Sequence, residues 1–477
     1  MSSLAPLLGD EFLLFSLVIT GYFALFNTIQ LVMLLVAFRR VRQRVRAIRL
    51  EDFREIQESG LAPPVSVVVP AHNEGPTVVE TIRSLLALRY VRLEIVVVND
   101  GSTDDTLARL IGEFGLRRTP RVYWQQLKCK PVRGIYWSPA CPRLWVLDKV
   151  NGRKADAVNA GINLASAPYV SVIDGDTIIE EGAILAMMHA ILPHSADTVA
   201  AGGTVRIANG CCLEGARAVQ VGVPRSFLAR AQIVEYLRAF LFGRVGWSEI
   251  QSLMIVSGAF GIFRKDVVVE IGGFRRDTVG EDIDVIVRMH RQLREAGRPY
   301  KVSFVPDPVC WTECPETLGG LRSQRERWHR GLGETLEHNR AMLGNPRYGR
   351  IGLLAMPYYM LFEYLAPLVE TAGFVILPFG WALGLVDWRL FLLFLIASFV
   401  YGLVLSLLGL VLEELSFRRY REPAQLAKLV MAAVLETVGL RQLQVWWRLV
   451  ALITWRGRAA SWVSMPRKGF QRAQVPT

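Results

Sequence analysis

The chain has 477 residues, of which 52% are hydrophobic and 21% charged, and its mean hydropathy is +0.29. This composition argues against a wholly soluble enzyme and favours a soluble domain joined to membrane segments. The net charge is +12, and six arginines lie between Arg39 and Arg49, directly after an apolar run. Such a block is typical of the cytoplasmic flank of a membrane helix, and no nucleic-acid-binding motif accompanies it, so we expect membrane lipids and no nucleic acid as partners. The six cysteines form no CxxC pair, which favours a reduced, cytosolic compartment.

The first element predicted along the chain is a membrane anchor. Residues 12–38 contain no charged residue, and this stretch is longer than the roughly 20 residues that cross a bilayer. It is too long for the core of a signal peptide. Residues 1–11 carry no Lys or Arg, so the positive-inside rule places the N-terminus outside and the arginine block in the cytosol. We therefore expect a transmembrane helix at residues 1–38 and a basic cytosolic linker at residues 39–63.

After the linker, short apolar runs alternate with stretches of helical spacing. The runs are rich in β-branched residues and predict buried parallel strands at residues 65–69, 93–98 and 169–173. Helical spacing is present at residues 77–88, 102–114 and 154–164. This alternation predicts an open α/β sheet with right-handed crossovers.

Polar residues follow each predicted strand, at the place where ligands bind in open α/β sheets. They are His72-Asn73-Glu74, Asn99-Asp100-Gly101-Ser102 and Asp174-Gly175-Asp176. No GxGxxG motif follows the first strand, so a dinucleotide-binding fold is disfavoured. Asp174 and Asp176 indicate a divalent metal that neutralises phosphate oxygens, because magnesium takes one or two carboxylates and fills its other positions with phosphate and water. A DxD alone is weak evidence, since turns are rich in Asp and Gly, but Asp100 at a neighbouring strand end strengthens it.

Residues 280–284 open a second helical region that could supply a catalytic acid or base. The sequence Gly-Glu-Asp-Ile-Asp precedes apolar residues at helical spacing. Glu281 and Asp282 either favour the helix N-terminus or place the Asp282 carboxylate in the cleft as a general base. Asp284 lies about 200° further around the same helix and is the local control. Residues 257–264 mix small and aromatic residues, which fits either a substrate wall or a packed turn.

A predicted helix at residues 321–331 carries a face with unusual chemistry. Helical spacing groups Gln324, Arg327 and Trp328, and Arg325 lies beside Trp328. Guanidinium groups suit the oxygens of a diphosphate, and an indole suits the apolar face of a sugar ring. The alternative is an amphipathic helix with Trp328 in a core and the arginines in solvent.

The C-terminal part of the chain is mostly apolar. Residues 351–386 contain Glu363 and Glu370, and residues 390–412 form an uninterrupted span. Residues 425–455 are too few for two crossings and lie between two basic segments expected in the cytosol, so we predict interfacial or re-entrant helices there. The expected domains are the α/β domain with its interfacial helix at 64–345, membrane and interfacial helices at 346–456, and a basic cytosolic tail at 457–477.

Six short motifs follow one another in order along the chain. They lie at residues 65–74, 98–102, 151–159, 174–176, 280–282 and 324–328. Together they resemble the membrane-integrated, processive members of glycosyltransferase family 2, which include cellulose, hyaluronan, chitin-type and poly-N-acetylglucosamine synthases. The resemblance implies a GT-A fold, a Rossmann-like nucleotide-sugar-binding domain in the cytosol, inserted between transmembrane helices of a bacterial-type inner membrane. It also implies a nucleotide-sugar donor, usually UDP-linked, and inversion at the anomeric carbon.

The resemblance further implies roles for residues on the donor side. Glu74 and Asp100 would hold the nucleoside. Lys154 would lie near the base and the diphosphate, and Asp174 near the ribose or the phosphates. Asp176 would bind the metal, Mg²⁺ or Mn²⁺.

On the acceptor side, the resemblance makes Asp282 the catalytic base, with Glu281 beside it. The pyrophosphate and the acceptor would be held by the face that contains Gln324, Arg325, Arg327 and Trp328. Two positions depart from the family pattern. The usual Thr-Glu-Asp begins with Gly280 here, and the usual Gly-Gly-Lys has Arg153 at its centre. Neither change removes a reacting group.

The expected reaction is inverting transfer of a hexose or N-acetylhexosamine from a nucleotide sugar to a growing polysaccharide at the cytosolic membrane face. Three clear spans are few for a polysaccharide channel, so the last segments complete it, subunits combine into a homo-oligomer, or a partner exports the product. The alternative reaction is non-processive glycosylation of a membrane lipid. A catalytically inactive nucleotide-sugar sensor would have lost one of the acids, and a transporter would carry its charges within the spans.

Overall fold

A mixed β-sheet forms the centre of the computed structural model, which describes residues 4–48, 62–454 and 456. Within these residues the sheet has ten strands in the order β3-β4-β5-β2-β1-β6-β11-β8-β12-β7. Strands β5, β2, β1 and β6 run parallel, whereas β11 runs antiparallel between β6 and β8. The bounds are β1 Val65–Ala71, β2 Leu93–Asp100, β3 Arg117–Arg118, β4 Val132–Trp137, β5 Leu144–Lys149, β6 Tyr169–Val172, β7 Ile178–Ile179, β8 Thr198–Ile207, β11 Gly261–Arg264 and β12 Lys301–Thr312, with a separate ribbon of β9 Cys212–Glu214 and β10 Arg217–Gln220.

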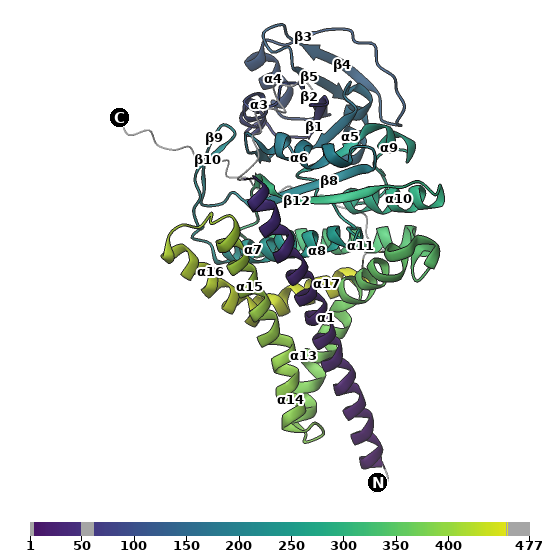
Figure 1. The fold of residues 1–477 in the computed structure, drawn as a ribbon, viewed down its shortest axis with the longest axis vertical. Coiled ribbons are helices and arrows are strands. Elements are labelled where there is room, and N and C mark those ends of the chain that lie inside the picture. The colour runs from purple at the N-terminus through teal and green to yellow at the C-terminus, as the bar shows by residue number, and fades with distance from the viewer. Residues whose placement is uncertain (1–3, 49–61, 455, 457–477) are drawn as a thin grey trace.

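Helices pack against this sheet, and α5 is one of them (Figure 1). Every residue of α5 after its first is buried. A side chain at Gly161 of α5 would overlap Val68 of β1 and Val98 of β2, so the helix backbone lies directly on these strands. This contact places Lys154, the first residue of α5, at the carboxyl ends of the strands. The helices of this group are α3 Val78–Leu86, α4 Thr106–Phe114, α5 Lys154–Leu164, α6 Ala183–Ile191, α9 Lys265–Glu270 and α10 Glu281–Glu295.

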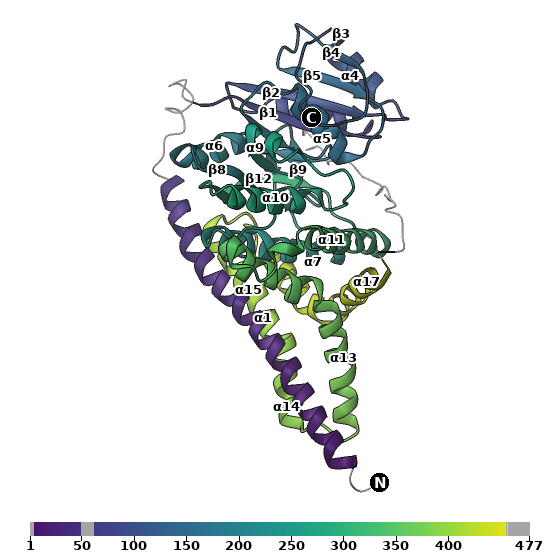
Figure 2. The same ribbon diagram turned by 90° about the vertical axis from the view of Figure 1, so that its right-hand side faces the viewer.

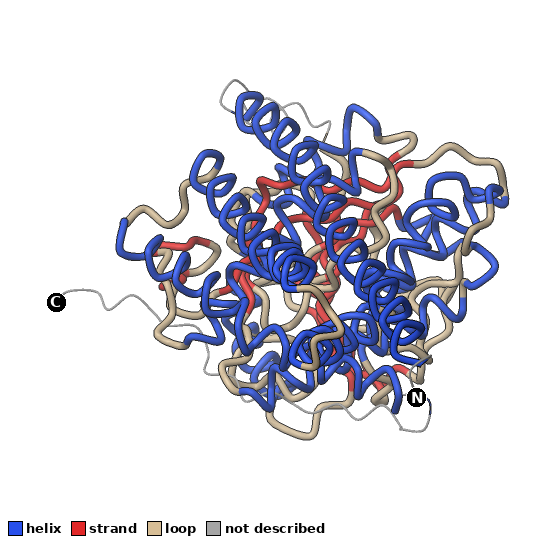
Figure 3. Tube along the Cα trace, turned by 90° about the horizontal axis from the view of Figure 1, so that it is seen from below, coloured by secondary structure: helices blue, strands red, loops and turns tan. Residues whose placement is uncertain are grey.

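A second layer of helices lies between the sheet and a set of apolar helices (Figures 1 and 2). Helices α1, α13 and α14 extend from this layer towards the end of the molecule opposite the sheet. Seen from that end in Figure 3, the helices lie over the strands. The bounds are α1 Leu4–Ile48, α7 Phe227–Leu237, α8 Val245–Glu249, α11 Leu318–His338, α13 Ala366–Ala382, α14 Trp388–Leu395, α15 Tyr401–Ser416, α16 Pro423–Leu435 and α17 Arg441–Thr454, with π-helical turns at Arg238–Arg244, Ile351–Ala355, Tyr359–Tyr364, Ile396–Val400 and Glu436–Leu440.

Three helical segments in the described part of the chain are long and apolar enough to cross a membrane. A bent pair of helices, with an angle of 43° at a short break, would add a fourth. The last candidate is interrupted at Val438 and Gly439, whose backbone angles are not helical. Residues 423–454 therefore form two helices that meet at a kink, and the interfacial or re-entrant placement predicted for residues 425–455 stays a prediction. The segments are Glu11–Ala47, Trp388–Ser416 and Pro423–Thr454, and the bent pair is Ile351–Tyr364 with Ala366–Ala382.

Helix α1 continues to Ile48 and includes the arginines from Arg39 to Arg46, so no structural break falls at the expected boundary after residue 38. Arg44 of this helix donates to Asp307 of β12 at 2.8 Å, and both side chains are largely buried. A second ion pair joins Arg206 of β8 to Glu413 of α15 at 2.7 Å, with each side chain 2% exposed. Because breaking a buried pair leaves an uncompensated charge, these contacts fix the sheet relative to the apolar helices. The expected tail at 457–477 and residues 49–61 of the expected linker lie outside the described residues.

Candidate active site

The carboxyl ends of β1, β2 and β6 lie side by side and carry the acids predicted from the sequence. Strand β1 pairs with β2 on one side and with β6 on the other. Asp100 is the last residue of β2, and Asp174 and Asp176 follow β6. A Cβ placed on Gly175 would lie 3.5 Å from the Cγ of Glu74, so the loop after β1 touches the DxD turn. The four acids therefore share one edge of the sheet.

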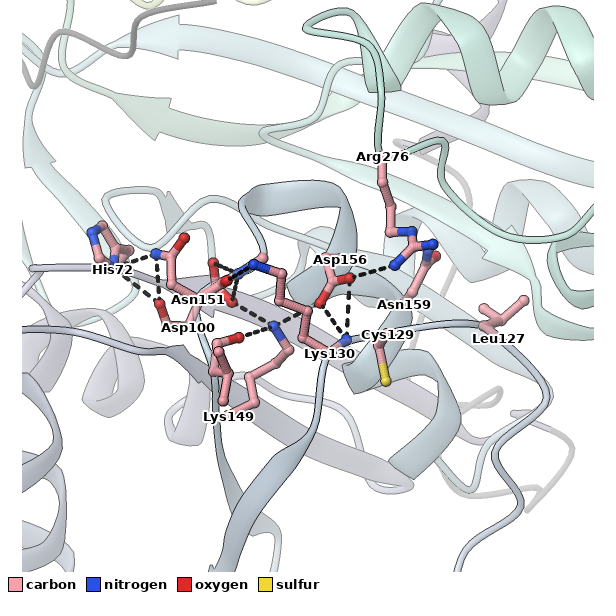
Figure 4. A network of polar contacts seen from close by, with 12 residues as sticks. His72, Asp100, Leu127, Cys129, Lys130, Lys149, Asn151, Asp156, Asn159 and Arg276 are labelled. Atoms are coloured by element: carbon pink, nitrogen blue, oxygen red, sulfur yellow. Dashed lines mark hydrogen bonds and ion pairs between the residues drawn. The ribbon is translucent and has the colours of Figure 1, made fainter.

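Asp100 belongs to a buried ion network (Figure 4). Its side chain accepts hydrogen bonds from Lys149 Nζ at 2.6 Å and from Gly152 N at 2.9 Å, and the residue is only 2% exposed. The fully buried Lys149 ammonium also lies 2.7 Å from Asp156, which accepts from Arg276 at 3.1 Å. A buried ammonium between two carboxylates is stable only while both partners stay in place. The network therefore holds Asp100 and the loop after β5 in fixed positions.

Sequence reasoning found Asp100 but missed Lys149 and Asp156. Burial raises the pKa of Asp156, but hydrogen bonds from Lys149 and other donors outweigh it, so this pKa lies below its ordinary value. Asp156 is therefore ionised at neutral pH, where it lies 2.7 Å from the Nζ atom of Lys149. Both residues carried a signal in the sequence. Lys149 is a charged residue at the end of a mostly apolar strand, and Asp156 lies inside the motif at residues 151–159.

Lys154 connects the strand ends to the start of α10. Its Nζ atom lies 2.6 Å from Asp174 Oδ1 and 3.3 Å from Glu281 Oε1. Burial lowers the pKa of Lys154, but these carboxylates outweigh burial and the pKa lies above its ordinary value, so the side chain stays protonated. Burial also raises the pKa of Glu281, and the charge of Lys154 opposes that shift. Residues predicted at two distant places in the sequence are thus in direct contact.

Asp282 lies beside this group with its carboxylate held by backbone amides. Ile283 N donates to Oδ1 at 2.9 Å and Gly258 N to Oδ2 at 3.4 Å. A Cβ on Gly258 would lie 2.7 Å from the Nζ of Lys154 and 3.7 Å from the Cβ of Asp282, so Gly258 lies close to both side chains. The segment 257–264 thus lines the site at Gly258, while its end forms strand β11. Asp284 is different, since it is fully buried and pairs with Arg288 at 2.7 Å.

Two glycines bring α10 and α11 into contact next to Asp282. A Cβ on Gly280 would lie 2.8 Å from the Cα of Gly331, and any side chain there would push the helices apart. The close approach leaves no room for a side chain at Gly280, the position where the family pattern usually has threonine. Glu334 of α11 accepts hydrogen bonds from Val279 N at 2.9 Å and Thr278 Oγ1 at 2.8 Å. Helix α11 therefore fixes the N-terminus of α10, where Glu281 and Asp282 stand.

The face of α11 predicted from the sequence is divided between buried and exposed side chains. Arg325 is 4% exposed, donates to Glu235 at 2.7 Å, and has its guanidinium carbon 4.6 Å from the centre of the Trp328 ring. Trp328 is 43% exposed, so the alternative that places it in a core is wrong. Gln324 is buried and its Oε1 has no hydrogen-bond partner among the described residues. Arg327 is partly exposed, and its charge acts on Glu281.

The residues at the DxD turn have the chemistry that a magnesium or manganese ion requires. No group of three or more His, Cys, Asp or Glu residues in the described ranges could hold a metal. Ions that bind a diphosphate need only one or two protein carboxylates, because phosphate oxygens and water complete the shell. Asp174 and Asp176 are both partly exposed, and both charges raise the pKa of the Cys310 thiol after the larger effect of burial. The two carboxylates have the oxygen chemistry that fits such an ion, and they follow the same strand, β6.

Arg244 is a further residue that sequence reasoning missed. It ends the π-helical turn after α7, and its guanidinium carbon lies 3.7 Å from the centre of the Phe240 ring. Its Nη1 atom is buried and has no hydrogen-bond partner in the described part of the chain. Burial lowers the pKa of Arg244 to about 10, and the charge of Asp282 is among those that oppose this shift. No sequence pattern distinguished this arginine from its neighbours.

Comparison with known protein families identifies the family to which the chain belongs. The family described as Glycosyl transferase family group 2 matches residues 169–413, which is just over half of the chain. The chain belongs to glycosyltransferase family 2. A second description, Glycosyl transferase family 2, matches residues 66–114 of this glycosyltransferase. The predicted family and enzyme class are confirmed, and so is an α/β domain between apolar helices.

Similar curated proteins are synthases of one polysaccharide. The poly-beta-1,6-N-acetyl-D-glucosamine synthase of Staphylococcus aureus (strain COL) is 31% identical over 274 residues, which are 57% of this chain and 55% of that protein. The synthase of Staphylococcus epidermidis is 30% identical over the same length. The glycosyltransferase described here thus spans about half the length of the curated relatives it matches.

Two solved structures cover a larger share of the chain at lower identity. The mannosyltransferase PcManGT from Pyrobaculum calidifontis in complex with GDP-Man and Mn²⁺ has a TM-score of 0.49 and 16% identity, and covers 88% of this chain and 99% of its own. Residues 1–349 of S. aureus TarS in complex with UDP-GlcNAc have a TM-score of 0.38 and 14% identity, and cover 82% of this chain and 91% of their own.

Proposed function

We propose that this glycosyltransferase transfers a sugar from a UDP-linked donor to a growing polysaccharide, with inversion at the anomeric carbon. The observation that carries the proposal is the contact between Gly280 and Gly331. It holds Asp282 at the start of α10 next to the α11 face that carries the exposed Trp328. One acid positioned between a donor edge and an acceptor face is what a single displacement requires.

The donor is proposed to lie along the strand ends. Glu74 and Asp100 would hold the nucleoside, with Asp100 kept in place by Lys149. Asp176 would hold a Mg²⁺ or Mn²⁺ ion, which would supply positive charge to the leaving diphosphate as a Lewis acid, and Asp174 would lie near the ribose or the phosphates. Lys154 stays protonated between its two carboxylates and adds a fixed positive charge at the same place.

The acceptor is proposed to enter from the side of α11. Its hydroxyl group would lie at Asp282, which takes the proton while the bond between the anomeric carbon and the diphosphate oxygen breaks. No covalent intermediate is needed, because inversion takes one displacement. Trp328 would stack on a sugar ring of the acceptor, and Arg327 would contact the diphosphate. Glu281 would act by holding Lys154.

A polysaccharide product requires a polar route past the apolar helices, and polar side chains lie between these helices. Arg448 of α17 donates to the carbonyl of Glu363, and Arg441 donates to the carbonyl of Ser398 at 3.2 Å. Asn27 of α1 donates to the carbonyl of Ala397 at 2.8 Å. Polar groups in membrane segments normally face the interior of a bundle or an aqueous path. They support export by this chain, alone or with further copies, from a cytosolic catalytic domain in the plasma membrane.

The similarity to poly-N-acetylglucosamine synthases favours an N-acetylhexosamine as the sugar. The test is to offer the purified full-length protein in detergent a panel of radiolabelled nucleotide sugars with Mg²⁺ or Mn²⁺, and to size the product. We expect polymer from UDP-N-acetylglucosamine and none after chelation of the metal. A product with a single sugar on a lipid would replace polysaccharide synthesis with lipid glycosylation. No transfer from any nucleotide sugar would contradict the proposed function.

A further inference from the structure

Arg153 lies between two residues of the proposed donor site and has an unusual backbone conformation. Its neighbour Gly152 donates through N to Asp100 at 2.9 Å, and its neighbour Lys154 lies 2.6 Å from Asp174. Arg153 has a φ of 73° and a ψ of 172°. This region of backbone space is open to glycine, whereas the Cβ of any other residue meets neighbouring backbone atoms there. An arginine at this position therefore strains the folded chain.

Contacts on the preceding residues hold the strained loop in place. Lys149 Nζ donates to the carbonyl of Val150 at 2.7 Å, and Lys130 Nζ donates to the carbonyl of Asn151 at 2.7 Å. The Asn151 side chain donates to the carbonyl of Asp100 at 2.9 Å (Figure 4). Backbone strain persists only where the surroundings over-determine it, and it is found mainly at functional sites. The contacts of Lys149, Lys130 and Asn151 over-determine the loop after β5 in this way.

The side chain of Arg153 is available for a function at this site. It is exposed, and in the described part of the chain it forms no ion pair with a protein carboxylate. The charge of Lys154, in contrast, is matched by Asp174 and Glu281. A guanidinium group that is always protonated, and that has no protein anion to neutralise it, suits an anionic ligand. The nearest proposed ligand with negative charge is the donor.

We propose that Arg153 binds the diphosphate of the nucleotide-sugar donor, and that the strained backbone is retained because it holds the guanidinium at the donor site. The inference rests on the proposed function, since it takes the strand-end edge as the donor site. The planar guanidinium presents two parallel N–H groups that match two phosphate oxygens. Arg153 thereby determines affinity for the diphosphate part of the donor and leaves recognition of the nucleoside to other residues.

Nucleotide binding by the purified full-length protein in detergent tests this inference. UDP and uridine are titrated, at constant Mn²⁺, into the wild type and into Arg153→Gly, Arg153→Ala and Arg153→Lys. We expect the Kd for UDP to rise about tenfold or more in the Gly and Ala variants, as for loss of a hydrogen bond to a charged group. The Kd for uridine should stay within about twofold of the wild type, because no contact to the nucleoside is removed. Arg153→Lys should retain part of the UDP affinity.

The Gly and Ala variants form a matched pair, because both lose the guanidinium but only Gly relieves the strain. Arg153→Gly should therefore melt at a higher temperature than Arg153→Ala while binding UDP equally weakly. An unchanged Kd for UDP in Arg153→Gly would overturn the inference, and so would an equal loss of UDP and uridine binding. Failure of the wild type itself to bind UDP would overturn the proposed function, which distinguishes that failure from failure of Arg153 alone.

Discussion

Arg325 and Arg327 stand two residues apart on α11 and have different surroundings. Arg325 is buried against Glu235, with Trp328 stacked over it, whereas Arg327 is partly exposed. An arginine beneath an indole contributes about 0.5–2 kcal/mol and restricts the orientation of the ring. Arg325 therefore supports the position of Trp328, while Arg327 and Trp328 remain accessible to substrate.

Replacement of Trp328 by alanine tests this division. If the ring stacks on the acceptor as proposed, its loss should raise the acceptor concentration for half-maximal transfer about tenfold and shorten the product. Donor binding, measured by calorimetry, should not change. Trp124→Ala is the control, because Trp124 is 81% exposed on a loop of the sheet domain. Normal product length in Trp328→Ala would show that the ring does not contact the acceptor.

Among the contacts between secondary-structure elements, the contact between α10 and α11 matters most for the proposed site. It depends on two glycines, and a Cβ on Gly331 would lie 2.7 Å from the Cα of Gly280. The neighbouring atoms belong to backbone, which cannot move aside as a flexible side chain can. The spacing of the two helices, and with it the position of Asp282, is thus set by the absence of side chains.

Gly331→Ala should therefore separate α10 from α11 and lower transfer about tenfold or more, since small displacements of catalytic groups are costly. Gly319→Ala is the matched control on the same helix, because nothing lies within 4 Å of a Cβ there. That variant should keep full activity and gain up to about 1 kcal/mol of stability from the better helix former. The check is the rate of transfer together with thermal melting. Equal activities in the two variants would contradict the role of the contact.

His290 anchors the middle of α10 and makes the stability of the domain depend on pH. The ring is 1% exposed, with Nδ1 2.7 Å from Tyr300 Oη and Nε2 2.8 Å from the carbonyl of Leu253. Burial lowers its pKa from 6.5 to about 4. The unfolded chain therefore binds a proton before the folded protein does, and stability is lost as the pH falls from about 6.5 towards 4.

Replacement of His290 by glutamine should remove this part of the pH dependence. At about 1.4 kcal/mol per pKa unit, it amounts to about 3 kcal/mol in the free energy of unfolding between pH 6.5 and pH 4. The measurement is the change in melting temperature between neutral and mildly acidic buffer. His338→Gln, at an exposed position on α11, should retain the wild-type change. If His290→Gln loses as much stability in acid as the wild type, the buried ring is not the titrating group.

Local patterns predicted the central strands well but not the contacts between distant segments. The apolar runs at residues 65–69, 93–98 and 169–173 correspond to β1, β2 and β6, because buried parallel strands need continuous β-branched residues. The antiparallel strand β11 and the two-residue strand β7 had no comparable signal. The burial of Arg325 could not be predicted either, since its partner Glu235 is 90 residues away in the chain.

At the scale of the whole molecule, buried ion pairs join the sheet to the apolar helices. Arg44 links α1 to β12, and Arg206 links β8 to α15. Helix α11 lies in the layer between the sheet and the apolar helices (Figure 2). An acceptor bound at Trp328 would therefore already lie at the side from which it must leave.

The distribution of positive charge along the chain predicts the orientation of the protein in the membrane. The arginine block after residue 38 should face the cytosol, so the N-terminus should face outside. A cysteine introduced by Ser3→Cys should react with a membrane-impermeant thiol reagent in intact cells, whereas the wild type, with its native cysteines in the cytosolic domain, should react only after permeabilisation. The reverse pattern would contradict the orientation.

The most direct measurement compares transfer with donor binding in Asp282→Asn. A positioned general base contributes roughly 10²–10⁴-fold to a rate, so transfer should fall by about that factor. Donor binding by calorimetry should stay close to wild type, because the amide keeps the shape of the side chain. Asp284→Asn cannot serve as the control, since Asp284 is buried against Arg288, and the exposed Asp277→Asn takes its place. Near-normal transfer in Asp282→Asn, or a parallel loss of donor binding, would show that Asp282 is not the base.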